Sequence, residues 1–151
     1  MLAARLKEFL DQKHIKYVTI DHSPAFTAQE VAQRAHIPGK EMVKTVIVKI
    51  DGEMAMVVTP ATECVRLGQL KKTLGAEEIS IASEYEFKDA FPDCETGAMP
   101  PFGNLYGMKV FISPTLREDE EIAFNAGTHK ELVRLTYADF ERLVEPVPLA
   151  A

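Results

Sequence analysis

The stretch that decides the fold is residues 42–59, which reads MVKTVIVKIDGEMAMVVT. Two runs rich in β-branched residues flank the pair Asp51-Gly52, and such a pair between apolar runs is the strongest short-range signal for a β-hairpin. A two-residue type I′ turn at this pair sets the register of the hairpin. In that register, Lys44 lies opposite Thr59.

Lys44 is unusual in the first strand of this hairpin. Both faces of the strand are largely apolar, which predicts an interior strand, and Lys44 shares its face with Met42, Val46, Val48 and Ile50. A buried ammonium is costly unless it meets an anion or a wet pocket, so this lysine is a candidate charge for a phosphate or a developing oxyanion. The alternative is a stem packed on the sheet with its head in solvent.

The composition is that of an ordinary globular protein of 151 residues, with 46% hydrophobic and 26% charged residues. This length predicts one domain, residues 1–151, with a substantial core. The N-terminus reads as an amphipathic helix without the apolar segment of a signal peptide, and no run approaches the about 18 apolar residues that cross a membrane. Cys64 and Cys94 make neither a disulfide framework nor a metal spacing, which favours reduced thiols in a cytoplasmic protein.

Local signals predict helices and strands along the rest of the chain. Thr27 with Glu30, and Ser83 with Glu86, are spaced as capping boxes that open helices. Helices are predicted over residues 2–13, 27–35, 66–74, 84–91 and 137–144, and strands over 17–20, 42–50, 53–59, 79–81, 109–113, 121–125 and 132–136. The predicted fold class is therefore α+β, a single domain with a curved, mixed and barrel-like β-sheet flanked by helices.

A second candidate element is the stretch from Gly97 to Gly103, which reads GAMPPFG and is called the 97–103 loop below. Its breakers exclude a helix and make a poor strand. Because glycine has no Cβ, such a loop presents backbone N–H and C=O groups to a ligand. A structural crossover loop is the alternative.

His129 is the third candidate, in a turn of residues 126–129 predicted between two strands. Imidazole suits proton transfer or a polar contact at neutral pH, and the alternative is a solvated turn residue. The other histidines, His14, His22 and His36, have no carboxylate or cysteine at ligand spacing, so neither a metal site nor a cofactor is predicted. The chain also lacks a Walker loop, a dinucleotide-binding glycine motif and a nucleophile elbow.

These features, in this order, resemble the YbaK and prolyl-tRNA synthetase-associated editing domain family. The resemblance covers nearly the whole chain, and it implies a YbaK-like fold. The matching motifs are the His22-Ser23-Pro24 loop with the helix after it, Val43-Lys44-Thr45, Thr59-Pro60-Ala61, the 97–103 loop, and the closing strand and helix.

The resemblance implies a trans-editing aminoacyl-tRNA deacylase. Such an enzyme hydrolyses the ester that joins a wrong, small amino acid (alanine, serine, threonine or cysteine) to the tRNA, here without a metal, a cofactor or a covalent intermediate. Lys44 and Gly97 are then the catalytic residues, with Lys44 contacting the tRNA 3′ end. The loop positions the aminoacyl group and a water, and the implied substrate-binding residues are Thr45, Thr59, Ala98, Met99, Pro100, Pro101, Phe102, Gly103 and His129.

The predicted partner is the 3′ end of a mischarged tRNA, with an aminoacyl-tRNA synthetase or an elongation factor as a further candidate, and with neither a membrane nor DNA. The net charge of −6 argues against unselective nucleic-acid binding, but a local basic patch is open to Lys40, Lys44, Lys49, Arg66, Lys71 and Lys72. Two alternatives remain: a non-catalytic binding module for a tRNA end, a nucleotide or an amino acid, and a structural protein that occupies a synthetase.

Overall fold

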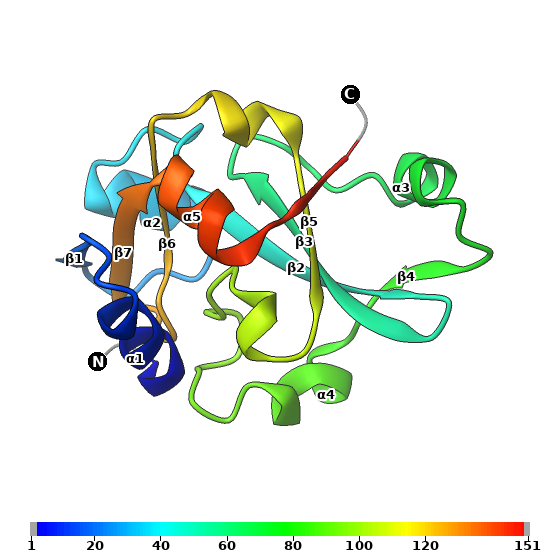
Figure 1. Cartoon of the computed structure of the whole chain (residues 1–151), viewed down its shortest axis with the longest axis horizontal. Helices are drawn as coiled ribbons and strands as arrows, with labels where there is room; N and C mark the ends of the chain where they lie inside the picture. The colour runs from blue at the N-terminus through cyan, green and yellow to red at the C-terminus, as the bar shows by residue number, and fades with distance from the viewer. Residues whose placement is uncertain (1–2, 150–151) are drawn as a thin grey trace.

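The strands of the protein form two β-sheets with helices around them (Figure 1). The computed structural model describes residues 3–149. The smaller sheet has the strand order β1 (Val18–Asp21), β7 (Glu131–Thr136) and β6 (Glu121–Asn125), and the larger has the order β4 (Ile79–Ile81), β2 (Val43–Ile50), β3 (Glu53–Pro60), β5 (Lys109–Ile112) and β8 (Val147–Pro148). The helices are α1 (Ala4–Gln12), α2 (Ala28–Ala35), α3 (Leu67–Leu74), α4 (Glu84–Phe87) and α5 (Tyr137–Val144), with the 3₁₀ turns η1 (Lys88–Ala90), η2 (Gly103–Leu105) and η3 (Pro114–Glu118).

The predicted α+β class and mixed sheet are confirmed. Strand β5 pairs in parallel with β3 and with β8, whereas β2 pairs antiparallel with both of its neighbours. The curvature does not close a barrel. A parallel bridge between Met42 and Ala123 joins the start of β2 to β6, and this bridge links the two sheets.

The predicted hairpin is confirmed in its register. Lys44 pairs with Thr59 across β2 and β3, and the turn residues have the positive φ angles that a type I′ turn needs, 50° at Asp51 and 88° at Gly52. Strand β2 is interior, but β4 pairs only with its last part, from Val48 onwards. The end of β2 that carries Lys44 therefore has β3 as its one ladder neighbour among the described strands.

One of the two predicted capping boxes is complete. The Ser83 hydroxyl accepts from the Glu86 amide, and the Glu86 carboxylate accepts from the Ser83 amide at 3.0 Å. At α2 only one half forms: Thr27 accepts from the Glu30 amide, but its hydroxyl donates to the Glu30 carboxylate. Glu30 therefore holds the side chain of Thr27 and not its amide. The predicted first helix begins at Ala4, and Leu2 lies outside the described residues.

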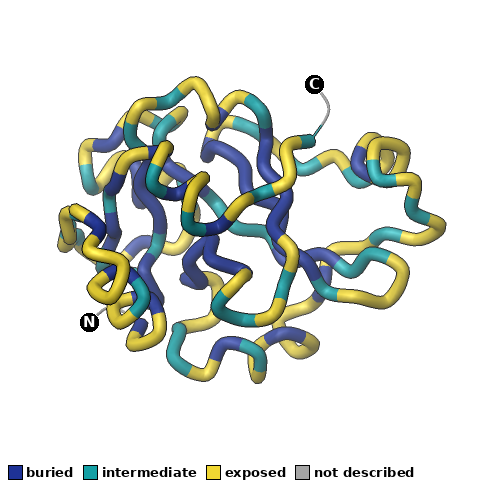
Figure 2. Tube along the Cα trace, viewed as in Figure 1, coloured by how far each residue is buried: buried dark blue, intermediate teal, exposed yellow. Residues whose placement is uncertain are grey.

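The core lies between the sheets, where buried strands cross the middle of the molecule (Figure 2). The aromatic centre of the main cluster is Phe102, whose ring lies 5.4 Å from that of Phe124 and 5.5 Å from that of Phe140. A second cluster joins Met42 of the bridge to α2 and to the smaller sheet through Ala123 and Leu132. A loop thus supplies the centre of the main cluster, the sheet junction belongs to the second, and a third cluster packs Leu70 of α3 on the larger sheet.

Candidate functional site

The 97–103 loop and the 126–129 turn meet at Gly97 and His129. A Cβ on Gly97 would lie 3.4 Å from Cε1 of His129, and Gly97 has a φ of 91° that favours glycine. His129 Nε2 donates to the Thr96 carbonyl at 2.9 Å, and the His129 amide donates to Glu95 Oε1 at 2.7 Å. The ring of His129 is therefore fixed against the exposed start of the loop.

Backbone bonds hold the same two segments together. The Glu95 amide donates to the Gly127 carbonyl at 2.7 Å, and the Gly127 amide donates to the Ala98 carbonyl at 2.9 Å. Glycine is required at Gly127 because a Cβ there would come within 2.8 Å of the Ala3 side chain, at a φ of 107°. The sequence places these partners about thirty residues apart, so no local pattern predicts the contact.

Most of the 97–103 loop is buried. Only Gly97 is exposed, while the six residues after it are buried: Ala98, Met99, Pro100, Pro101, Phe102 and Gly103. Gly103 is a packing glycine, since a Cβ there would lie 2.6 Å from the Met108 carbonyl oxygen. The Gly97 amide itself donates to the Met99 sulfur at 3.2 Å. The structure thus presents the beginning of the loop to solvent and uses the rest as its anchor.

An exposed aromatic residue completes this region. Phe26, 70% exposed, lies with its ring centroid 4.7 Å from that of His129, and the neighbouring Ala25 amide donates to the His129 carbonyl at 3.3 Å. Phe26, Glu95 and Thr96 were not predicted as site residues from the sequence. The sequence held one signal for this region. Phe26 is a large apolar residue in the loop before α2, and such a side chain is normally buried, so its place in a loop indicates a contact with another segment or a ligand.

Lys44 is half-buried, and its side chain makes no hydrogen bond or ion pair with the residues of 3–149. Met42, which comes just before β2, packs in the second cluster with Ala25, and the Ala25 amide donates to the His129 carbonyl. Thr45 points to the opposite face, as its neighbours Val43 and Ile47 belong to the main core. No hydrogen bond joins Lys44 to Gly97 or His129 in the described part of the chain.

Three buried acceptor atoms lie where β1 and β6 end and β7 begins: His22 Nε2, Asn125 Oδ1 and His129 Nδ1. None of them has a hydrogen-bond donor among the described residues. His22 Nδ1 lies 2.7 Å from the Ser23 carbonyl, so the lone pair of the neutral ring is on Nε2, and the Thr96 contact leaves the lone pair of His129 on Nδ1.

The segments that carry these acceptors are adjacent. Asn125 pairs with Leu132 in β7, and the His22 amide continues the β1–β7 ladder by donating to the Lys130 carbonyl at 2.8 Å. Strand alternation places Asn125 and His22 on the face that packs with Met42. This arrangement suits a ligand with several N–H donors, such as an ammonium group.

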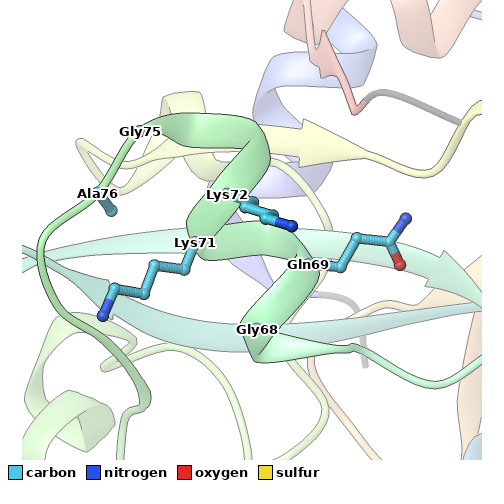
Figure 3. Close-up of a pocket in the computed structure, with 6 residues that line it drawn as sticks. All are labelled: Gly68, Gln69, Lys71, Lys72, Gly75 and Ala76. Carbon is cyan, nitrogen blue, oxygen red and sulfur yellow. The ribbon is translucent and has the colours of Figure 1, made fainter.

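Two pockets lie near α3. One, of about 700 Å³, is formed by residues of α3 and its C-terminal end alone, and Figure 3 shows Lys71 pointing away from Gln69 and Lys72 there. The other, of about 530 Å³, includes Thr59 and brings several elements together. Lys49, one residue of the predicted basic patch, forms an ion pair with Glu86, with 2.6 Å between Nζ and Oε2. Neither pocket includes Gly97 or His129.

Two further findings concern residues 3–149. No helix there is long and apolar enough to span a bilayer. No group of three or more His, Cys, Asp or Glu side chains is arranged there as a metal site.

Comparison with known proteins identifies the chain. The sequence model of the aminoacyl-tRNA editing domain matches residues 22–143. The chain belongs to this family. The predicted resemblance is thereby confirmed, and with it an editing function directed at aminoacyl-tRNA. The match includes Lys44, the 97–103 loop and His129.

Relatives of this editing domain differ in their architecture. The multifunctional Ser/Thr-tRNA deacylase ProXp-y of Escherichia coli K12 is 29% identical over 147 residues, which cover 94% of the chain and 87% of the relative. A proline–tRNA ligase of Halalkalibacterium halodurans is 24% identical over 91% of the chain, but this match is only 26% of the ligase. A crystal structure of a candidate trans-editing enzyme for prolyl-tRNA synthetase superposes with a TM-score of 0.81 at 21% identity, covering 99% of the chain and 96% of that structure.

Proposed function

We propose that the protein is a trans-editing deacylase of the cytoplasm, with residues 1–151 acting as one editing domain. It hydrolyses the ester of a tRNA mischarged with a small amino acid, without a metal and without a covalent intermediate. Membership of the editing family and the 29% identity to the Ser/Thr-tRNA deacylase ProXp-y, over 87% of that relative's length, support this function. A synthetase or an elongation factor is the partner we expect to deliver the tRNA.

The observation that carries the proposal is the contact of His129 with Gly97 beside unpaired buried acceptors. An aminoacyl ester has an α-ammonium group next to its carbonyl carbon. The acceptors Asn125 Oδ1 and His129 Nδ1 suit that ammonium, because each has a lone pair and no donor within the described chain. Exposed Gly97 then lies beside the ester, where the absence of a Cβ permits a close approach.

The chemical step needs little from the protein. A water adds to the ester carbonyl carbon, the carbon–oxygen bond to the ribose breaks, and the ribose oxygen takes a proton that the water releases. The neighbouring ribose hydroxyl assists this transfer, and the protein orients the reactants. Lys44, a cation with no partner among the described residues, contacts the 3′ end and offsets negative charge near the reacting ester.

The test is ester hydrolysis on a panel of mischarged tRNAs that carry alanine, serine, threonine or cysteine. We expect turnover of at least one ester, unchanged by a chelator. Lys44→Ala is expected to lower kcat/KM by about 10²-fold or more, the usual effect of removing a charge-stabilising group. The matched control is Lys49→Ala, which removes a lysine of the same strand whose partner is Glu86.

Three outcomes would contradict different parts of the proposal. A folded protein that binds tRNA ends stoichiometrically but turns over no ester is the binding module considered above. Full activity of a folded Lys44→Ala protein would remove Lys44 from the mechanism while leaving the deacylase in place. Loss of activity with a chelator, restored by a metal ion, would contradict the metal-free reaction.

A further inference from the structure

A second candidate site lies under α3, at some remove from His129. The cavity of about 530 Å³ is lined by residues of β3, of the segment 62–66, of α3 and of the start of η3, and we call it the α3 pocket. Its apolar wall includes Val57 and Leu70. The size and the mixed lining suit a nucleotide-sized ligand with one apolar face and several polar groups.

Thr59 gives the first sign of a ligand. Thr59 lines the α3 pocket and lies on the same face of β3 as Val57, the residue is only 4% exposed, and Oγ1 has no hydrogen-bond partner within residues 3–149. A buried hydroxyl without a partner costs about 1–3 kcal/mol in a folded protein. Such a group is explained if the pocket receives a polar ligand.

The beginning of α3 gives the second sign. The N-cap residue, Arg66, provides no side-chain cap, and the amides of Leu67, Gly68 and Gln69 have no acceptor in the described part of the chain. Arg66 and Gln69 line the α3 pocket, and Arg66 makes no ion pair with a described residue. Free amides at a helix N-terminus together with a guanidinium attract an anion, above all a phosphate.

Glu63 provides the opposite charge in the same pocket. The Ser113 hydroxyl donates to Glu63 Oε1 at 2.7 Å, and the Thr115 hydroxyl donates to Oε2. A carboxylate has about four acceptor positions, so this fixed group can still accept from a ligand amine. The pocket therefore combines an anion site, a carboxylate and a hydroxyl.

We propose that the α3 pocket binds the cytidine nucleotide that precedes the terminal adenosine of the tRNA 3′ end. The cytosine 4-amino group donates to Glu63, as in the recognition of cytosine by carboxylates. The phosphate lies at the first turn of α3 and Arg66, and the Thr59 hydroxyl donates to a ring acceptor of the base.

The position of the pocket fits this role. Thr59 pairs directly with Lys44 across the hairpin, so their Cβ atoms are about 5 Å apart. The proposed function places the terminal nucleotide at Lys44, and the preceding nucleotide then lies beside it, on the Thr59 side. This assignment rests on the proposed function, but its test does not use hydrolysis.

The test compares two dinucleotides, 5′-phosphorylated CpA and 5′-phosphorylated UpA, in NMR titrations of the full chain at millimolar concentrations. Uracil has a carbonyl oxygen where cytosine has its amino group, and Glu63 repels it. We expect CpA to bind about tenfold more tightly than UpA, to shift the amide signals of the first turn of α3, and to slow alkylation of Cys64, an exposed thiol on the rim of the pocket.

Two variants separate ligand binding from structure. Thr59→Val keeps the shape but removes the unpaired hydroxyl, so we expect an unchanged or higher Tm together with about tenfold weaker CpA binding. Glu63→Gln is expected to reduce the preference for CpA over UpA. The matched controls are Thr19→Val and Glu53→Gln, at exposed positions of β1 and β3, with unchanged binding expected.

Three results would each overturn the proposal. These are equal binding of CpA and UpA, no binding of either dinucleotide, and CpA binding that is unchanged in Thr59→Val. A failure of the proposed function is distinguishable from these results. If CpA binds as expected but no aminoacyl ester is hydrolysed, the pocket stands and the deacylase does not. If esters are hydrolysed and the dinucleotides do not discriminate, the deacylase stands and the pocket assignment does not.

Discussion

The imidazole of His129 lies directly against Gly97, so that a Cβ on this glycine would be 3.4 Å from Cε1 of the ring. The same ring donates to the carbonyl of Thr96, the residue before Gly97. Two features therefore favour glycine at position 97: its positive φ angle and the His129 ring next to it. This relationship fixes the position of the exposed start of the 97–103 loop relative to the His129 ring.

Gly97→Ala should separate backbone strain from function. A left-handed alanine costs about 1–2 kcal/mol of stability, and Gly107→Ala is the matched control because Gly107 has a φ of 69° with nothing within 4 Å of its Cβ position. Both variants should lose similar stability in urea unfolding. Only Gly97→Ala should also lose deacylation, by about tenfold or more, since its Cβ would fill the space beside the His129 ring where we place the ester. Equal activity of the two variants would contradict the placement of the ester at Gly97.

Asn125→Leu tests the recognition of the α-ammonium. The wild-type protein should hydrolyse an ester with a free ammonium faster than the N-acetylated ester. Asn125→Leu should lower the ratio of these two rates about tenfold, because hydrogen bonds to charged groups contribute about 1.5–3 kcal/mol. Stability should not fall, as Oδ1 has no donor among the described residues. An unchanged preference for the free ammonium, in a folded variant, would exclude Asn125 from this role.

The ionisation of Glu86 makes the stability of the fold depend on pH in the acidic range. The hydrogen bond from Lys49 and those from Ser83 lower the pKa of Glu86 to about 2 from an ordinary value of 4.5. A lowered folded-state pKa contributes stability above the unfolded value, and the contribution is lost as the pH falls from about 4.5 towards 2. The difference in Tm between wild type and Glu86→Gln should therefore shrink over this range. A constant difference would show that the charge of Glu86 contributes nothing.

The two cysteines should differ in reactivity. Burial raises the pKa of Cys94 to about 11, whereas Cys64 is exposed. Alkylation with iodoacetamide at pH 8, followed by mass spectrometry, should modify Cys64 first, and Cys64→Ser should abolish the fast phase. Because the pKa of Cys94 is raised on folding, its contribution to stability should become unfavourable as the pH rises above about 9. Equal rates at the two thiols would contradict the burial of Cys94.

The hairpin was predictable because its signals are local. Asp51 and Gly52 determine the turn, the turn determines the register, and the register pairs Lys44 with Thr59. The capping residue Ser83 acts over only three positions, so it too could be read from the sequence. Thr27 fulfils only half of its capping prediction, because a hydroxyl and a carboxylate at this spacing have two ways to pair.

The candidate site was less predictable because it is built from distant segments. Breakers in the 97–103 loop exclude regular structure, but they do not say whether the loop is exposed, and Phe102 turns most of it into core. The contact between Glu95 and His129 spans 34 residues. The importance of Asn125 depends on the strand opposite it, so no pattern within a single strand indicates it.

The bridge between Met42 and Ala123 has a consequence for when the protein is active. Lys44 belongs to one sheet, while Asn125 and His129 belong to the other sheet and the turn attached to it. Local opening at this junction would separate them although each sheet stayed folded. If these residues form the site as we propose, activity should be lost together with protection of the Ala123 amide, which donates to the Glu41 carbonyl, and before the global unfolding of the chain. Under that proposal, deacylation is lost at a lower temperature than the one at which the whole chain unfolds.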